Sequence, residues 1–192
     1  MCPGAGDDAI LDATGGDYTV TSKSSETVNG IQTAANATFD IDGNTSTEVM
    51  FEVLSGTDGG VNAGTIRVTS GAILLLAGGT VDNEGLITVG VHPRTTAGIS
   101  IEGGTTVTLD GGGNLILGSG FFAGNDSPGI STLINVDNII SGSGEFYGVY
   151  GGDLNYVNQI AGVIDASVHS EPSQFYMATV ANQGILESTD HG

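Results

Sequence analysis

Short runs of alternating apolar and polar residues, separated by glycine-rich bends, recur along the whole chain. In the run 37–42, Ala37, Phe39 and Ile41 alternate with threonine and aspartate, so one face of an extended strand is apolar. Further runs of this length are predicted as strands at 18–22, 48–54, 65–70, 72–76, 86–89, 99–102, 105–109 and 115–117. No stretch has helical periodicity, so the pattern predicts an all-β protein.

Two phrases repeat at the bends. The first reads Asn-x-Gly-x-(Ile/Leu), with a looser copy at Asn158 in which the glycine comes two residues later. Its copies pair Asn62 with Gly64, Asn83 with Gly85, Asn158 with Gly162, and Asn182 with Gly184. The second phrase, Asn-(Leu/Ile)-Ile-x-Gly-Ser-Gly, begins at Asn114 and at Asn138. Each phrase places a turn residue and a glycine beside a short apolar run, which is typical of a strand next to a tight bend.

The spacing of these phrases predicts the architecture. Successive copies follow one another every 20 to 24 residues, apart from a step of 31 between Asn83 and Asn114. A fixed period in the twenties predicts a solenoid, here a parallel β-helix of roughly seven coils with strands stacked about 4.8 Å apart. The predicted division is a leading segment or cap at 1–17, a single solenoid domain at 18–188 and a tail at 189–192. An antiparallel sandwich with regular turns is the alternative.

In a solenoid, the same position of every coil lies above its predecessor. The repeated asparagines are therefore predicted to form a ladder of hydrogen-bonded amides, with the glycines permitting the backbone angles of each bend. This reading makes the repeated asparagines and glycines structural.

Charge narrows the range of partners. The chain has 3 basic and 22 acidic residues and a formal net charge of −19, with 33 glycines among its 192 residues. Three scattered basic residues cannot neutralise the phosphates of a nucleic acid or hold the chain on an anionic membrane surface. No apolar run approaches the length of a membrane-spanning segment. The single cysteine excludes an intramolecular disulfide. The acidic, lysine-poor composition favours an extracellular or cell-surface location.

Several phrases resemble the repeats of a known class of proteins. They are LINVDNIISGSG at 133–144, LNYVN at 154–158, GVIDAS at 162–167 and VANQGILES at 180–188. These phrases look like the repeats of bacterial surface proteins of the filamentous-haemagglutinin and autotransporter-passenger type, and the resemblance covers residues 60–188. It implies a right-handed parallel β-helix displayed outside the cell, often in adhesion.

Candidate chemistry is sparse. A polysaccharide lyase or hydrolase would need clustered carboxylates with basic residues beside them, and the best local set is His92, Arg94 and Glu102 in the oversized coil. No catalytic residue is therefore assigned, and no cofactor is expected beyond a structural calcium ion. The weak candidate ligands for calcium, grouped around Gly43, are Asp40, Asp42, Asn44 and Glu48.

Aromatic residues concentrate in the later coils, where eight of the 11 Phe and Tyr side chains lie between 121 and 176. Exposed tyrosines there would form a platform for a glycan or a protein, whereas buried ones would fill the core. The residues predicted for such a recognition surface are Tyr147, Tyr150, Tyr156 and Tyr176.

The sequence as a whole favours an extracellular structural or adhesive module without catalysis. The open strand edges at the ends of such a rod would allow self-association end to end. A polysaccharide-degrading or glycan-binding β-helix, such as a tail-spike-like domain, is the alternative.

Overall fold

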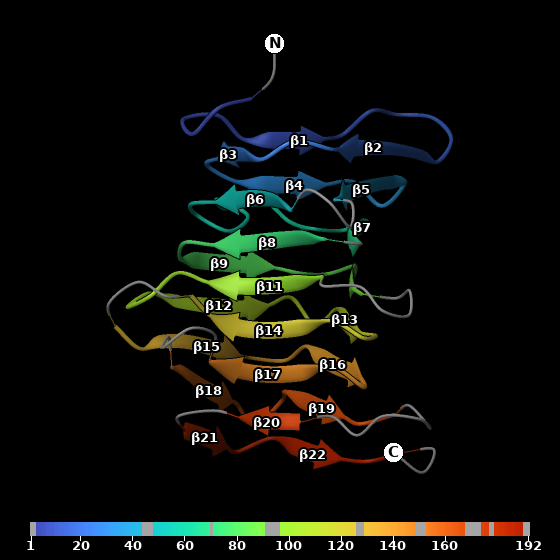
Figure 1. Cartoon of the computed structure of the whole chain (residues 1–192). Coiled ribbons are helices and arrows are strands. Elements are labelled where there is room, and N and C mark those ends of the chain that lie inside the picture. Colours follow the sequence, from blue (N-terminus) through green and yellow to red (C-terminus); the bar gives the residue numbers. More distant parts are fainter. Residues whose placement is uncertain are drawn as a thin grey trace.

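The chain winds into a stack of parallel β-strands. The computed structural model describes residues 3–43, 48–69, 71–90, 97–125, 129–148, 153–167, 174–176 and 179–189. Within them every strand pairing is parallel and no helix occurs. The fold is a β-solenoid of about six turns, and its two termini lie at opposite ends of the stack (Figure 1).

Three sheets form the sides of the stack, and the chain visits them in a repeating order. We call them sheets I, II and III. Sheet I has eight strands, β2 (Tyr18–Ser22), β5 (Ala37–Asp42), β7 (Thr65–Thr69), β10 (Leu86–Val89), β13 (Asn114–Leu117), β16 (Ile139–Gly142), β19 (Val163–Asp165) and β22 (Ile185–Glu187). Sheet II has seven, β3 (Glu26–Val28), β6 (Val49–Val53), β8 (Ala72–Leu76), β11 (Gly98–Ile101), β14 (Phe121–Gly124), β17 (Glu145–Gly148) and β20 (Gln174–Tyr176).

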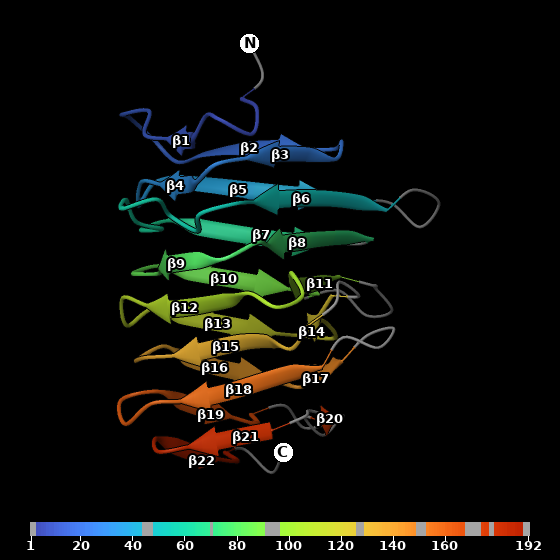
Figure 2. The ribbon, with the colours of Figure 1, turned by 90° about the vertical axis from the view of Figure 1, so that its left-hand side faces the viewer.

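Sheet III has five strands, β9 (Gly79–Asp82), β12 (Thr106–Asp110), β15 (Ser131–Asn135), β18 (Leu154–Asn158) and β21 (Thr179–Asn182). Two further strands, β1 (Ala9–Leu11) and β4 (Ile31–Thr33), pair with each other near the N-terminus. Isolated parallel bridges join Thr33 to Asn62 and Asn62 to Asn83, so β4 is connected to the residue that follows β9 of sheet III. Because β1 pairs with β4, part of the segment 1–17 belongs to the first coil. Figure 2 shows the stack from the side.

Register is kept from coil to coil, but coil length is not constant. In sheet I, Thr65 lies opposite Leu86, Leu86 opposite Asn114, and Asn114 opposite Ile139. These steps are 21, 28 and 25 residues, so the first agrees with the roughly 20 to 24 that the repeat predicts and the other two are longer. Alternation holds each strand in place because a shift of one residue would turn its apolar side chains toward water. Variation in length is therefore confined to the bends.

The interior is a continuous apolar core made by the inward face of every sheet. In β5, for example, Ala37, Phe39 and Ile41 are buried while the residues between them reach the surface. Aromatic side chains pack inside this core: Phe122 stacks on Phe146 with ring centroids 5.7 Å apart, and Phe39 meets Phe51 edge to face at 5.0 Å. Such pairs add about 0.5–1.5 kcal/mol to the burial of the rings.

Candidate functional site

A ladder of side-chain amides runs through the bends between sheets III and I. Thr33 Oγ1 donates to Asn62 Oδ1, and Asn62 Nδ2 donates to Asn83 Oδ1 at 2.6 Å. Asn83 Nδ2 in turn donates to Asn138 Oδ1 at 2.8 Å. All four side chains are buried. The amides of Asn62 and Asn83 both donate toward the C-terminal end of the stack, so their dipoles align and the two bonds polarise each other.

The ladder continues through the later coils. The Asn138 backbone N–H donates to Asn135 Oδ1 at 3.1 Å, which joins the first series to a second. Asn135 Nδ2 donates to Asn158 Oδ1 at 2.9 Å, and Asn158 Nδ2 donates to Asn182 Oδ1 at 2.8 Å. Asn182 lies at the last described coil and is exposed. The polar series thus extends from the second coil to the C-terminal end.

Asn114 does not join the ladder, although the repeated phrase predicts that it should. It is the exposed first residue of β13 and offers only its backbone oxygen, which accepts from Asn83 Nδ2 at 3.2 Å. Glycines occupy the preceding bend, and a Cβ on Gly113 would lie 2.8 Å from Asn83 Nδ2. The space beside Gly113 lets the Asn83 amide pass this coil and reach Asn138. Sequence reasoning missed Thr33 and Asn135, because neither belongs to a repeated phrase.

The glycines of the Asn-x-Gly phrase are required by space rather than by their backbone angles. Gly64, Gly85, Gly162 and Gly184 all have ordinary backbone conformations, which corrects the expected role. A Cβ on Gly85 would lie 2.2 Å from the Gly64 carbonyl oxygen, and one on Gly184 would lie 2.2 Å from that of Gly162. Each glycine therefore allows one bend to sit directly on the bend before it.

Tyr156 is not on the surface, so the recognition surface predicted from the sequence is wrong for this residue. In β18, Leu154, Tyr156 and Asn158 point inward, and Tyr156 is 0% exposed. Its ring meets Phe146 edge to face at 5.7 Å. Tyr150 lies outside the residues that the structure describes, as do the side chains of Tyr147 and Tyr176.

The Tyr156 hydroxyl is buried without a hydrogen bond of normal geometry. Burial raises the pKa of this phenol above its ordinary value, and the nearby Asn135 amide offsets part of the rise. The phenol therefore stays neutral in the folded protein well into the alkaline range.

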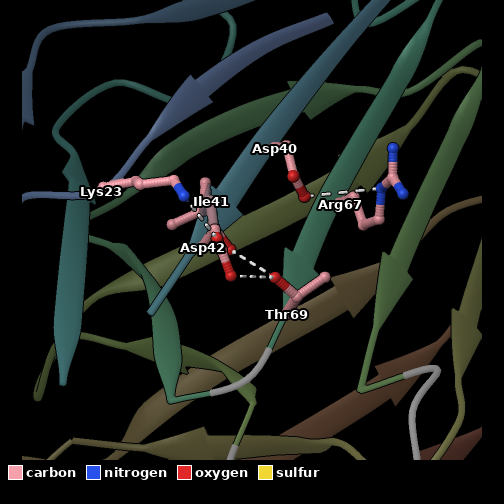
Figure 3. A network of polar contacts seen from close by, with 6 residues as sticks. All are labelled: Lys23, Asp40, Ile41, Asp42, Arg67 and Thr69. Atoms are coloured by element: carbon pink, nitrogen blue, oxygen red, sulfur yellow. Dashed lines mark hydrogen bonds and ion pairs between the residues drawn. The ribbon is translucent and has the colours of Figure 1, made fainter. Parts of the chain in front are cut away.

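Two of the candidate calcium ligands, Asp40 and Asp42, lie on the outward face of β5 in sheet I, where each pairs with a cation, whereas Glu48 lies exposed before β6 of sheet II. Arg67 Nε lies 3.5 Å from Asp40 Oδ1, and Lys23 Nζ lies 3.4 Å from Asp42 Oδ2 (Figure 3). Thr69 Oγ1 donates to Asp42 Oδ1 at 3.2 Å, which ties β5 to β7. Asn44 lies outside the described residues. Within the described ranges, no three His, Cys, Asp or Glu side chains come close enough to hold a metal ion.

Of the residues weighed for a polysaccharide-degrading site, Glu102 alone lies within the described part of the chain. His92 and Arg94 fall outside the described part of the chain, and Glu102 contributes a backbone oxygen that accepts from Thr105 Oγ1 at 2.7 Å. The described residues also include no helix that could cross a bilayer.

The two ends of the stack differ from its sides. At the N-terminal end a hollow of about 600 Å³ opens, with Val20, Phe39 and Phe51 among its apolar lining and Asp7 and Glu26 among its polar lining. At the C-terminal end the side chains of Val180, Ile185 and Leu186 are exposed. These two surfaces are the candidate functional site of the protein.

Comparison with known protein families, with curated proteins and with solved structures gives no match.

Proposed function

We propose that this protein is an extracellular structural module, a rigid β-solenoid segment of the kind found in bacterial filamentous-haemagglutinin and autotransporter-passenger proteins, without catalytic activity. The observation that carries the proposal is the hydrogen-bonded ladder from Thr33 to Asn182. The side chains of this ladder lie in the bends of successive coils and form hydrogen bonds to one another. An interior arranged in this way serves to fix the register of a rod.

The outward faces fit the same role. The outward face of sheet I in the first coils includes one column of short polar side chains, Thr19, Thr38 and Thr65. Eight strands about 4.8 Å apart give sheet I a height of roughly 35 Å, with the backbone hydrogen bonds directed along that height. A pull along the rod would load many such bonds together, which suits a spacer on a cell surface.

Location is the first test. Antibodies raised against the purified chain should label intact cells of the source organism as strongly as permeabilised cells. Labelling that needs permeabilisation would overturn the extracellular part of the proposal.

Activity and adhesion are tested with polysaccharides. The purified protein, incubated with acidic and neutral polymers, should release no shortened products by size-exclusion chromatography. Shortening that disappears in Arg94→Ala would instead establish the lyase or hydrolase alternative. Binding to a glycan array that is lost in Tyr147→Ala or Tyr150→Ala would assign an adhesive role, while binding that those variants retain would place the contact elsewhere.

A further inference from the structure

One interior column of sheet I reaches both ends of the stack. Its members occupy the same register position in eight successive strands: Val20, Phe39, Ile66, Ile87, Leu115, Ile140, Ile164 and Leu186. The six inner members are each at most 4% exposed. The two end members are not covered in this way, since Val20 is 42% exposed and Leu186 is 55% exposed.

The strands that carry these end residues each have one free edge. Among the strands that the structure describes, β2 pairs only with β5 and β22 only with β19, so they bound sheet I. All strands of the sheet run in the same direction. The free edge of β22 could therefore form a parallel pair with the free edge of β2 of another copy, as neighbouring coils do within one chain. The two edges are therefore complementary to each other, and neither is complementary to itself in the same parallel arrangement.

Apolar surface accompanies both edges. The hollow beside β2 has Phe39 and Phe51 in its lining, while Val180 extends the exposed surface beside Leu186 onto sheet III. Val180 lies in register with Tyr156, an interior position of the preceding coil. Both ends thus present side chains that every intermediate coil buries.

We propose that a second copy of this chain docks head to tail, with β22 of one copy pairing with β2 of the next and Leu186 extending the column beyond Val20. The proposal rests on the structural role given above and specifies how the module would assemble. In this register Glu187 falls opposite Thr21. Lys23, which pairs with Asp42 at 3.4 Å, lies two residues further along, where its ammonium group would also attract Glu187.

Two features oppose docking and limit its strength. The formal charge of −19 on each copy produces repulsion that salt would screen, with a Debye length of about 10 Å at 0.1 M. Glu26 lies in register with the buried Phe51 at the N-terminal end of sheet II, so a docked copy would remove water from its carboxylate. Association is therefore expected at high protein concentration and to strengthen as NaCl is added.

Small-angle X-ray scattering and sedimentation velocity on the purified 192-residue chain test the geometry. Between micromolar and millimolar protein, particles should lengthen while the radius of gyration of their cross-section stays constant. Growth of the cross-section would show side-by-side association and overturn the proposal. A chain that stays monomeric at every protein and NaCl concentration would overturn the proposal as well. This holds even if a hydrophobic dye binds to the hollow of the monomer.

Three variants separate the end contact from general effects of charge. Leu186→Asp should raise the dissociation constant by about tenfold or more, because it replaces the apolar end of the column with a charge. Ile160→Asp is the matched control, since Ile160 is 83% exposed in a bend of an inner coil and should change association by less than about threefold. Glu26→Gln should strengthen association by removing the charge that docking would desolvate.

Circular dichroism establishes that each variant is folded before association is measured. Equal association of Leu186→Asp and Ile160→Asp would refute the assigned interface even if the wild-type chain assembles. These readouts are independent of the polysaccharide and labelling experiments, so failure of docking and failure of the structural role are distinguishable.

Discussion

The buried amide ladder makes a quantitative prediction at Asn62. Its side chain accepts a hydrogen bond from Thr33 Oγ1 and donates one to Asn83 Oδ1. Asn62→Ala removes both hydrogen bonds. It leaves the Thr33 hydroxyl hydrogen and Asn83 Oδ1 without these partners at a buried site that water cannot reach. Each such group costs about 1–2 kcal/mol, so the free energy of unfolding should fall by about 2–4 kcal/mol. For a domain of this size the corresponding fall in Tm is roughly 5–12 °C.

Two further variants make this comparison specific. Asn114→Ala deletes the same side chain at the exposed start of β13, outside the ladder, and should change stability by at most about 0.5 kcal/mol. Asn62→Asp keeps the shape of the residue but places an oxygen against Asn83 Oδ1. It should therefore destabilise at least as much as Asn62→Ala.

Equilibrium urea unfolding followed by far-ultraviolet circular dichroism measures these differences, with an unchanged m-value as the condition for comparing them. Hydrogen exchange would show whether the loss of protection centres on the coils that contain Thr33, Asn62 and Asn83. If Asn62→Ala and Asn114→Ala unfold with the same free energy, the ladder does not stabilise the fold and the reasoning is wrong.

Three other substitutions test separate contacts. Gly85→Ala should cost about 1–3 kcal/mol because its Cβ would lie 2.2 Å from a backbone oxygen, whereas Gly16→Ala, which meets nothing within 4 Å, should be nearly neutral in the same urea titration. Tyr156→Phe should leave stability at neutral pH within about 1 kcal/mol, because it removes a buried hydroxyl that has no hydrogen bond. The pKa of Tyr156 is raised in the folded state, so its contribution to the free energy of unfolding is intact below the unfolded pKa of 10 and is lost as pH rises above that value. Tyr156→Phe should therefore lessen the loss of stability at alkaline pH. Arg67→Ala should cost about 1 kcal/mol, measured by thermal unfolding, because it removes the partner of Asp40, and a loss beyond about 3 kcal/mol would contradict this partly exposed pair.

The arrangement of the ladder explains why so few residue types recur at the bends. An asparagine side chain carries both a donor and an acceptor, so one residue can bond to the coil before it and to the coil after it. Thr33 serves at the N-terminal start of the series, where its hydroxyl donates to Asn62 and accepts from the Gly64 N–H at 3.1 Å. A carboxylate could accept at both sides but could not donate, and would interrupt the series.

The alternation and the repeated phrases determined the class of fold. Residues such as Ala37, Phe39 and Ile41 set an inward face because side chains of a strand alternate, and this holds whatever the strand pairs with. The period of the Asn-x-Gly phrases then predicted coils, parallel pairing and an amide ladder. These features could be predicted because they depend on neighbours within a few residues or on simple repetition.

Only the tertiary structure decided which residues meet across coils. The bends differ in length, so Asn114 falls at the exposed start of a strand while Asn135, which no phrase marks, enters the ladder. Bend length likewise set the steps of 21, 28 and 25 residues between neighbouring strands of sheet I. The pairing of Asp40 with Arg67 joins residues 27 positions apart, a distance that local pattern does not fix.

The same limit applies to the functional site. Local alternation within β18 is compatible with either face pointing inward, and the burial of Tyr156 was settled by its register with Leu133 and by the Phe146 ring packed against it. Val20 and Leu186 look like ordinary core residues in the sequence. Their exposure follows from their places at the two ends of one column, because the number of neighbours above and below a residue is a property of the stack.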